Sequence, residues 1–190
     1  MNIKRTLGRM AIALATTGLM GTAIADTTIA YITNGNTNEG WTLINGGAKK
    51  AGEKKGVTFI QLAAEKGELS KQLAIVEDMI TRKVNAIAIA PVDSAGIAPA
   101  INKALAAGIK VVAVDTGISG ANITSYVATD NIKAAMVQGD WVASQVKDGD
   151  TVIYVTGDQG QSTGQERKKG FVDGLNAKRK NVKIVEVPTT

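Results

Sequence analysis

The sequence lacks two residue types on which much enzyme chemistry depends. Its 190 residues include no cysteine and no histidine. Without cysteine there is no disulfide framework, no thiolate-bound zinc and no thiol nucleophile. Without histidine there is no Ser-His-Asp triad, no histidine general base and no histidine metal ligand. No nucleophile–base pair or metal-ligating cluster replaces them, so we expect no enzymatic activity, no metal and no cofactor.

Aromatic residues are also scarce, at 4% of the chain. That is too few for a stacking platform along single-stranded nucleic acid. The net charge of +5 first suggests an anionic partner, but Lys4, Arg5 and Arg9 contribute three of these charges. We therefore expect no nucleic-acid partner.

The N-terminal segment has the three parts of a secretory signal peptide. Basic residues precede Met10, apolar or small residues follow to Gly21, and Ala23-Ile24-Ala25 forms an A-x-A ending. The apolar stretch is too short for a membrane-spanning helix, which needs about 20 apolar residues. The sequence therefore predicts a signal peptide over residues 1–25, cleaved after Ala25.

After residue 26, short β-rich runs alternate with longer amphipathic runs. Strands are predicted at 28–33, 57–63, 86–90, 110–114, 124–128, 151–156 and 182–187. Helical spacing separates them; one helix has its core face formed by Leu69, Leu73, Val76 and Ile80. This alternation predicts an α/β fold with parallel, Rossmann-like sheets covered by helices. Ligands then bind outside the carboxyl ends of the strands, which selects the loops at 34–41, 91–94, 115–120, 129–131 and 157–167.

These loops carry motifs in a specific order. An asparagine-rich loop leads to Trp41, and after it come A-P-V-D-S (90–94), V-V-A-V-D-T (111–116), Y-V-A-T-D-N (126–131) and T-G-x-x-G-x-S-T-G-x-E-R-x-x-G-F (156–171). Their order and spacing resemble the ribose-binding-protein group of type I periplasmic sugar-binding proteins, in the LacI/ribose-binding superfamily. The resemblance runs from Asp26 to the last residue.

The resemblance implies two Rossmann-like lobes that close on a sugar, with the first hinge crossing near Asp130 and Asn131. We therefore expect an N-terminal α/β lobe over residues 26–129 and a partial C-terminal lobe over 130–190. Complete members have more strands in the second lobe, so the chain resembles a C-terminally truncated member. An incomplete second lobe should expose apolar surface and an unpaired strand edge.

The resemblance also implies sugar-binding residues after the first strand. Asn38 matches the sugar-binding asparagine, and Trp41 matches the second of two adjacent aromatic residues; Gly40 takes the place of the first. The alternative roles are a helix N-cap for Asn38 and ordinary packing for Trp41.

Four further positions match the family's binding site. Asp115 matches an aspartate that can accept two sugar hydroxyls; its alternative role is a turn residue. Thr116 stands where ribose binders carry arginine, which argues against ribose and leaves another sugar or a polyol. Arg167 matches the cleft arginine of the second lobe, or is a solvated helix charge. Asn131 is a hinge and helix-cap residue that can reach the cleft.

These matches predict a periplasmic substrate-binding protein of an ABC-type importer for a monosaccharide or polyol. The partners implied are the ligand and an inner-membrane ABC permease, and we expect a monomer. The absence of a cysteine for lipid attachment favours free residence in the periplasm. The alternatives are a sugar receptor for chemotaxis or signalling, and the effector domain of a LacI-type regulator. The regulator would need a helix-turn-helix where this chain has its predicted signal peptide.

Overall fold

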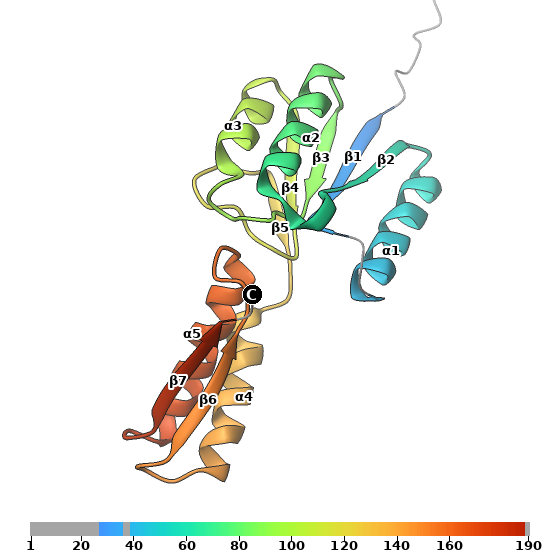
Figure 1. Cartoon of the computed structure of the whole chain (residues 1–190). Coiled ribbons are helices and arrows are strands. Elements are labelled where there is room, and N and C mark those ends of the chain that lie inside the picture. The colour runs from blue at the N-terminus through green and yellow to red at the C-terminus, as the bar shows by residue number, and fades with distance from the viewer. Residues whose placement is uncertain (1–26, 36–38, 189–190) are drawn as a thin grey trace, which may run out of the picture.

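The computed structural model describes residues 27–35 and 39–188, which form two α/β units of different size (Figure 1). The predicted signal peptide and Asn38 lie outside the described residues. None of the described helices is long and apolar enough to cross a membrane.

The first unit, which we call the first lobe, contains a five-stranded parallel sheet in the order β2-β1-β3-β4-β5. Its strands are β1 (Thr28–Thr33), β2 (Thr58–Ala63), β3 (Ala86–Ile89), β4 (Lys110–Val114) and β5 (Ser125–Val127). Each connection is too long for a hairpin, which suits parallel pairing. The predicted parallel sheet is therefore confirmed, and the predicted bounds of β1 and β4 agree with the structure.

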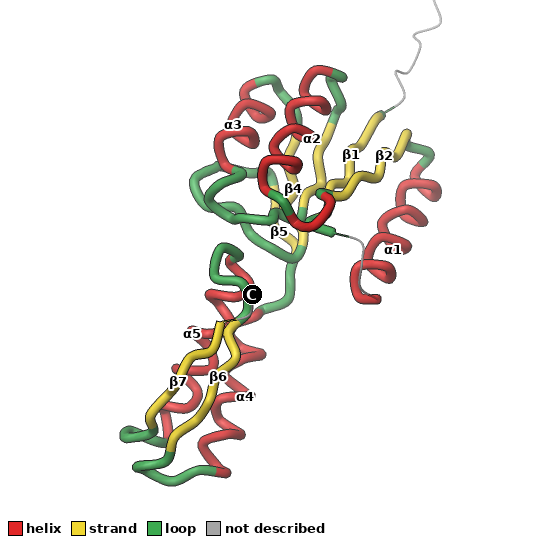
Figure 2. The backbone as a smooth tube through the Cα atoms, in the orientation of Figure 1, coloured by secondary structure: helices red, strands yellow, loops and turns green. Residues whose placement is uncertain are grey.

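Helices α2 (Leu69–Thr81) and α3 (Ala98–Ala106) cover one face of this sheet, and α1 (Glu39–Lys55) lies beside β2, apart from them (Figure 2). Alternate strand residues point toward α2 and α3. Ile32, Ile87 and Val111 are fully buried there with Val76 of α2 and Ile101 of α3. Burying each such side chain contributes roughly 1.5–3 kcal/mol, so this face is the main core of the lobe.

A buried glutamine fixes the loop that follows β3. Gln72 of α2 is fully buried, and its Nε2 donates to the Ala90 carbonyl oxygen at 2.9 Å. Its Oε1 accepts from the Val92 amide at 2.8 Å. One side chain thus satisfies two backbone groups of this loop, which orders the backbone at the carboxyl end of the sheet.

The second unit, the second lobe, contains the two-stranded parallel sheet β6-β7. Its elements are α4 (Asn131–Gln145), β6 (Thr151–Thr156), α5 (Ser162–Lys178) and β7 (Lys183–Pro188). Asp130 caps α4, because its Oδ1 accepts from the Lys133 amide at 3.1 Å. Hydrogen bonds with Lys133 also hold the pKa of Asp130 below its ordinary value.

Glycines let α4 and α5 pack with their backbones in contact. A Cβ at Gly139 of α4 would overlap the Phe171 carbonyl oxygen, and a Cβ at Gly174 of α5 would overlap that of Met136. Gly170 of α5 is equally close to the α4 backbone. We call this contact the glycine seam. No other residue type could occupy these positions without separating the helices.

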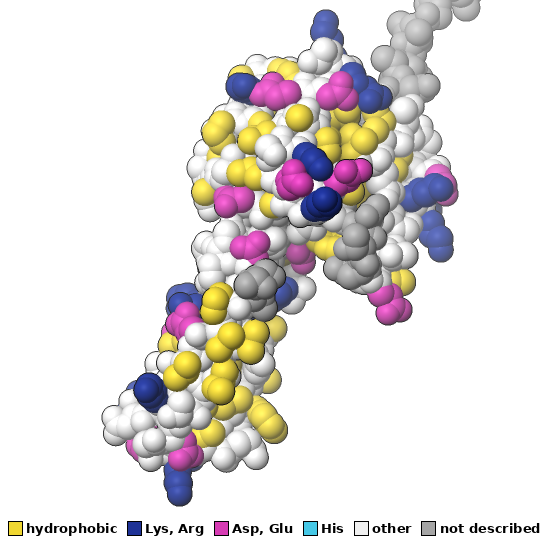
Figure 3. Space-filling view, in the orientation of Figure 1, with side chains coloured by type: hydrophobic (Ala, Val, Ile, Leu, Met, Phe, Trp, Pro, Cys, Tyr) yellow, Lys and Arg dark blue, Asp and Glu magenta, His cyan; other side chains and the backbone are white. Residues whose placement is uncertain are grey.

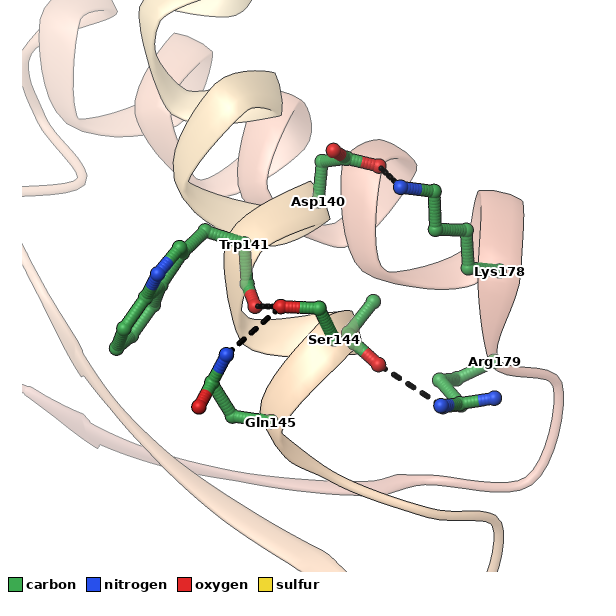
Figure 4. A network of polar contacts seen from close by, with 7 residues as sticks. Asp140, Trp141, Ser144, Gln145, Lys178 and Arg179 are labelled. Atoms are coloured by element: carbon green, nitrogen blue, oxygen red, sulfur yellow. Dashed lines mark hydrogen bonds and ion pairs between the residues drawn. The ribbon is translucent and has the colours of Figure 1, made fainter.

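Polar contacts secure the far end of the glycine seam (Figure 4). Arg179 Nε donates to the carbonyl oxygens of Ala143 and Val146, at 2.9 and 2.8 Å. Ala143 lies in the last turn of α4 and Val146 is the C-cap that follows it, and carbonyl groups at a helix end have no partner within the helix. Lys178 pairs with Asp140 at 2.6 Å across the two helices. The end of α5 therefore caps the end of α4.

The face of β6 and β7 opposite these helices is exposed and apolar. Hydrophobic side chains gather over both strands (Figure 3); Ile153 is 68% exposed and Val155 is 60% exposed, and Val185 and Val187 lie beside them on β7. The expected exposure of apolar surface in the second lobe is confirmed.

The glycine seam can be tested by adding one methyl group. We expect Gly139→Ala to lower the free energy of unfolding by roughly 2 kcal/mol, because overpacking of a tight contact costs about 1–3 kcal/mol. Gly46→Ala is the matched control, because Gly46 lies inside α1 and nothing lies within 4 Å of the position that its methyl group would take. This substitution should raise the free energy of unfolding by about 0.5–1 kcal/mol. Urea unfolding followed by circular dichroism measures both. Equal stability of Gly139→Ala and the unsubstituted chain would contradict backbone contact at the seam.

Candidate ligand-binding site between the two lobes

Loops from both lobes meet at the carboxyl edge of the first sheet. The loop after β3 contacts the loop after β6, where the Ser94 amide donates to the Gly160 carbonyl oxygen at 3.0 Å. Because parallel strands all end at the same edge, the loops after β1, β2 and β4 reach the same region. The region where the two lobes contact each other is therefore at the carboxyl ends of the strands, where parallel α/β sheets bind ligands.

A cavity of about 340 Å³ lies between these loops. The first lobe contributes Asn34, Gly35, Trp41, Lys66, Gly67 and Val92, and the second lobe contributes Asp158 and Gln161. Trp41 belongs to the first turn of α1 and supplies the aromatic surface. One aromatic ring among amide and charged groups is the lining expected for a small ligand with many hydroxyls.

Lys66 brings a positive charge to this cavity from a strained turn. It lies in the short 3-10 helix η1 (Glu65–Gly67) with a φ of 57°, in the left-handed region that residues with a Cβ rarely adopt. Both neighbouring carboxylates, Glu65 and Glu68, pair with Lys71 at 3.5 Å. Within the described residues Lys66 forms no such ion pair, so its ammonium group is available at the cavity wall.

Asp115 and Thr116 follow β4 in a tight turn. Asp115 has a φ of 62°, and its amide donates to the Val127 carbonyl oxygen at 2.9 Å. The fully buried Thr116 donates its hydroxyl to Asp115 Oδ2 at 3.2 Å. The strained backbone thus presents a carboxylate that a neighbouring hydroxyl orients. Sparsely populated backbone conformations of this kind concentrate at binding sites.

Asn131 and Arg167 form a second polar group, on the second lobe. Arg167 Nε donates to Asn131 Oδ1 at 2.9 Å. The Asn131 Nδ2 group donates to Glu166 Oε2 at 3.2 Å and to the Thr129 carbonyl oxygen at 3.1 Å. Asn131 is buried, so its amide uses its hydrogen-bonding capacity to orient Arg167. This leaves the Nη groups of the guanidinium without a partner among the described residues.

Tyr126 of β5 lies between these two polar groups. Its hydroxyl donates to the Asp115 carbonyl oxygen at 2.9 Å. Burial raises the pKa of Tyr126 above its ordinary value, and a hydrogen bond with Ser162 opposes this rise. The charges of Glu166 and Asp115 also raise this pKa, whereas Arg167 lowers it. Charged groups of both lobes therefore influence one phenol, that of Tyr126.

The predicted site residues are brought together only in part. Trp41 lines the cavity, Asp115 contacts Thr116, and Asn131 contacts Arg167. Asp115, Thr116, Asn131 and Arg167 are not among the residues that line the cavity with Trp41. Asn38 lies outside the described residues. In the described residues, no group of three or more acidic side chains is arranged to hold a metal ion.

Several site residues were not predicted from the sequence. Lys66, Asp158 and Gln161 line the cavity, and Tyr126 joins the polar groups. Asp158 and Gln161 follow β6 within the selected loop 157–167, so position after a strand was an available signal for them. Tyr126 lies within β5 and begins the motif at 126–131, and that position gave no such signal. Lys66 follows β2, and its loop carries no motif that distinguishes it.

Tyr31 of β1 is a buried polar residue near Asp115. Its ring stacks on Phe59 with centroids 5.8 Å apart, and the residue is 2% exposed. Its hydroxyl has no hydrogen-bond partner among the described residues. Burial raises the pKa of Tyr31 above 10.0, and the charge of Asp115 adds to the rise. An unpaired buried hydroxyl of this kind destabilises the folded state.

Comparison with known proteins gives consistent matches over nearly the whole described chain. A family model described as periplasmic binding protein domain matches residues 29–190. The ribose import binding protein of Escherichia coli (strain K12) is 30% identical over 183 residues, which is 96% of this chain and 61% of that protein. The D-ribose/D-allose-binding protein of Pseudomonas aeruginosa is 33% identical over 159 residues, 78% of this chain and 50% of that protein. The chain spans less than two thirds of the length of either relative.

Solved structures share the fold over most of the chain. The Caulobacter myo-inositol binding protein bound to myo-inositol has a TM-score of 0.78 and 27% identity, covering 86% of this chain and 55% of that one. A carbohydrate transporter solute binding protein from Agrobacterium radiobacter, in complex with D-arabinose, has a TM-score of 0.77 and 27% identity, covering 87% and 58%.

The unpaired hydroxyl of Tyr31 predicts a stabilising substitution. Tyr31→Phe removes the buried polar group and should raise the free energy of unfolding by about 1 kcal/mol at pH 7. Tyr31 stays neutral in the folded chain but ionises on unfolding above pH 10, so stability is lost as pH rises from its ordinary pKa of 10.0 toward the raised folded pKa. The variant should lose less stability over that range.

Thermal unfolding from pH 7 to 11 measures both effects. Tyr126→Phe is the matched control, because it removes a hydroxyl that has a partner and should not stabilise the chain. A Tyr31→Phe variant less stable than the unsubstituted chain at pH 7 would show that the hydroxyl makes a favourable contact.

Proposed function

Because the chain belongs to the periplasmic binding protein domain family, we propose that it is the periplasmic substrate-binding protein of an ABC-type sugar importer. Its ligand would be a monosaccharide or a polyol, bound between the two lobes. The observation that carries the proposal is the cavity between the lobes, in which Trp41 of one lobe shares the lining with Asp158 and Gln161 of the other. Family membership agrees with the expectation that the chain is a binding protein and not an enzyme.

The chemistry of the lining favours a neutral ligand with many hydroxyls. Lys66 and Asp158 bring opposite charges to one cavity. These charges cancel, so the lining does not favour an anionic or a cationic ligand. Each sugar hydroxyl can donate to a carboxylate and accept from an ammonium or amide group. Thr116 takes the place of an arginine in ribose binders, so we expect a ligand other than ribose. The relatives named above bind ribose, allose, myo-inositol or arabinose according to their names, which spans this class.

In this proposal each binding residue makes a different kind of contact with the ligand. Trp41 would stack on the C–H face of the ring. Asp115 would accept ligand hydroxyls with the oxygen that Thr116 leaves available, and Arg167, held by Asn131, would donate from its Nη groups. Asn38 is proposed as a further hydrogen-bonding residue from the resemblance alone.

Ligand binding would couple to closure of the lobes. The described chain passes between them once, at residues 128–130. A ligand with contacts on both lobes binds the closed arrangement better and shifts the population toward it. In this proposal the closed form presents the surface that an inner-membrane permease recognises.

A ligand panel tests this proposal. Thermal unfolding of the chain is measured with pentoses, hexoses and inositols, since a ligand at 100 times its dissociation constant stabilises by about 2.7 kcal/mol. We expect at least one to raise the melting temperature. Trp41→Ala and Asp115→Asn should each weaken that ligand's affinity by roughly tenfold or more.

Asp173→Asn is the matched control, because Asp173 pairs with Lys169 on the surface of α5 and should leave affinity unchanged. No stabilisation by any member of the panel, with a folded chain and concentrations up to tens of millimolar by order of magnitude, would overturn the proposal.

A further inference from the structure

Two serines connect the lobes by direct hydrogen bonds. Ser94 lies in the loop after β3 and is 3% exposed, and Ser162 is the first residue of α5. The Ser162 amide donates to Ser94 Oγ at 2.9 Å. The Gly117 amide donates to Ser162 Oγ at 2.8 Å. Ser162 therefore acts as both donor and acceptor toward the opposite lobe.

The first of these bonds supplies a helix cap from the other lobe. The first amides of a helix have no partner within it and are usually capped by the preceding side chain. At α5 the preceding residue, Gln161, makes no such side-chain hydrogen bond. Ser94 performs this role instead, so the start of α5 is capped only while the lobes are together.

The contact also depends on the absence of side chains at two glycines. A Cβ at Gly117 would lie 3.2 Å from Ser162 Oγ, and a Cβ at Gly160 would lie 3.0 Å from Asp93 Oδ2. The Ser94 amide meanwhile donates to the Gly160 carbonyl oxygen at 3.0 Å. Backbone and side-chain groups of the two lobes thus fit closely at one place.

We propose that Ser94, Gly117 and Ser162 form a latch that holds the lobes closed, and that the two serines are positioning residues for ligand binding. The latch and part of the cavity wall share one segment: Asp158 and Gln161 line the cavity, and Ser162 follows directly. Closing the latch therefore brings these two side chains to the wall opposite Trp41. The effect on affinity rests on the proposed function, whereas the effect on closure does not.

Lobe closure can be measured directly because the chain has no cysteine. Spin labels are attached at Lys103→Cys on α3 and Asn176→Cys on α5, both exposed positions, and distances are measured by pulsed electron resonance without ligand. Ser94→Ala and Ser162→Ala should each lower the closed-to-open ratio, by about fivefold for one lost hydrogen bond and more for two. Ser70→Ala, an exposed serine on α2, should leave the distances unchanged.

A steric variant tests the latch from the other lobe. Gly117→Ala keeps both serine hydroxyls but places a methyl group against Ser162 Oγ, so it should open the lobes as Ser162→Ala does. The double variant Gly117→Ala with Ser162→Ala should be no more open than Ser162→Ala alone, because the atom that the methyl group meets is then absent. Additive opening in the double variant would overturn the proposal.

Ligand kinetics separate the latch from the proposed function. With any ligand that binds the unsubstituted chain, Ser94→Ala and Ser162→Ala should raise the dissociation rate and leave the association rate nearly unchanged. Unchanged label distances in Ser94→Ala, Ser162→Ala and Gly117→Ala would overturn the latch. If these variants open the lobes while no ligand of the panel binds any variant, the latch holds and the proposed function fails.

Discussion

Parallel strand pairing is the constraint on which the arrangement of this chain depends. It points all five strands of the first sheet the same way, so their carboxyl-end loops share one edge. Trp41, Lys66, Ser94 and Asp115 come from four different loops or helix starts, yet each lies at that edge. The second lobe approaches it with the loop after β6. Cavity, polar groups and lobe contact are thus consequences of a single strand direction.

The second lobe is organised by its helices more than by its sheet. Two parallel strands bury little apolar surface of their own, and one face of β6 and β7 is exposed. The backbone contact between α4 and α5 at Gly139 and Gly174 compensates for this, with Phe171 stacked on Tyr154 at 4.6 Å beneath it. This support fixes the start of α5, and with it Ser162 and Arg167, relative to Asn131.

The sequence was sufficient to predict elements whose pattern is local. The strands at 28–33, 110–114 and 151–156 agree with the structure at both ends, because β-branched runs there stop at turn residues. Gly108 has a φ of 81° directly after α3, a conformation that glycine readily adopts at a helix end. Local patterns also identified Trp41 and Asp115 as residues after strands. They could not identify the glycine seam, the cap from Ser94 or the burial of Tyr31, because each depends on which distant backbone lies opposite.

The described chain passes between the lobes at residues 128–130, and this short connection influences how strong a contact between them has to be. A short tether converts association of two bodies into an intramolecular event with an effective concentration in the millimolar range. An interface with a dissociation constant of the same order would then keep the lobes together for about half of the time. Three hydrogen bonds and a close fit at two glycines are therefore enough to influence the balance, and so weak an interface also leaves the lobes free to separate.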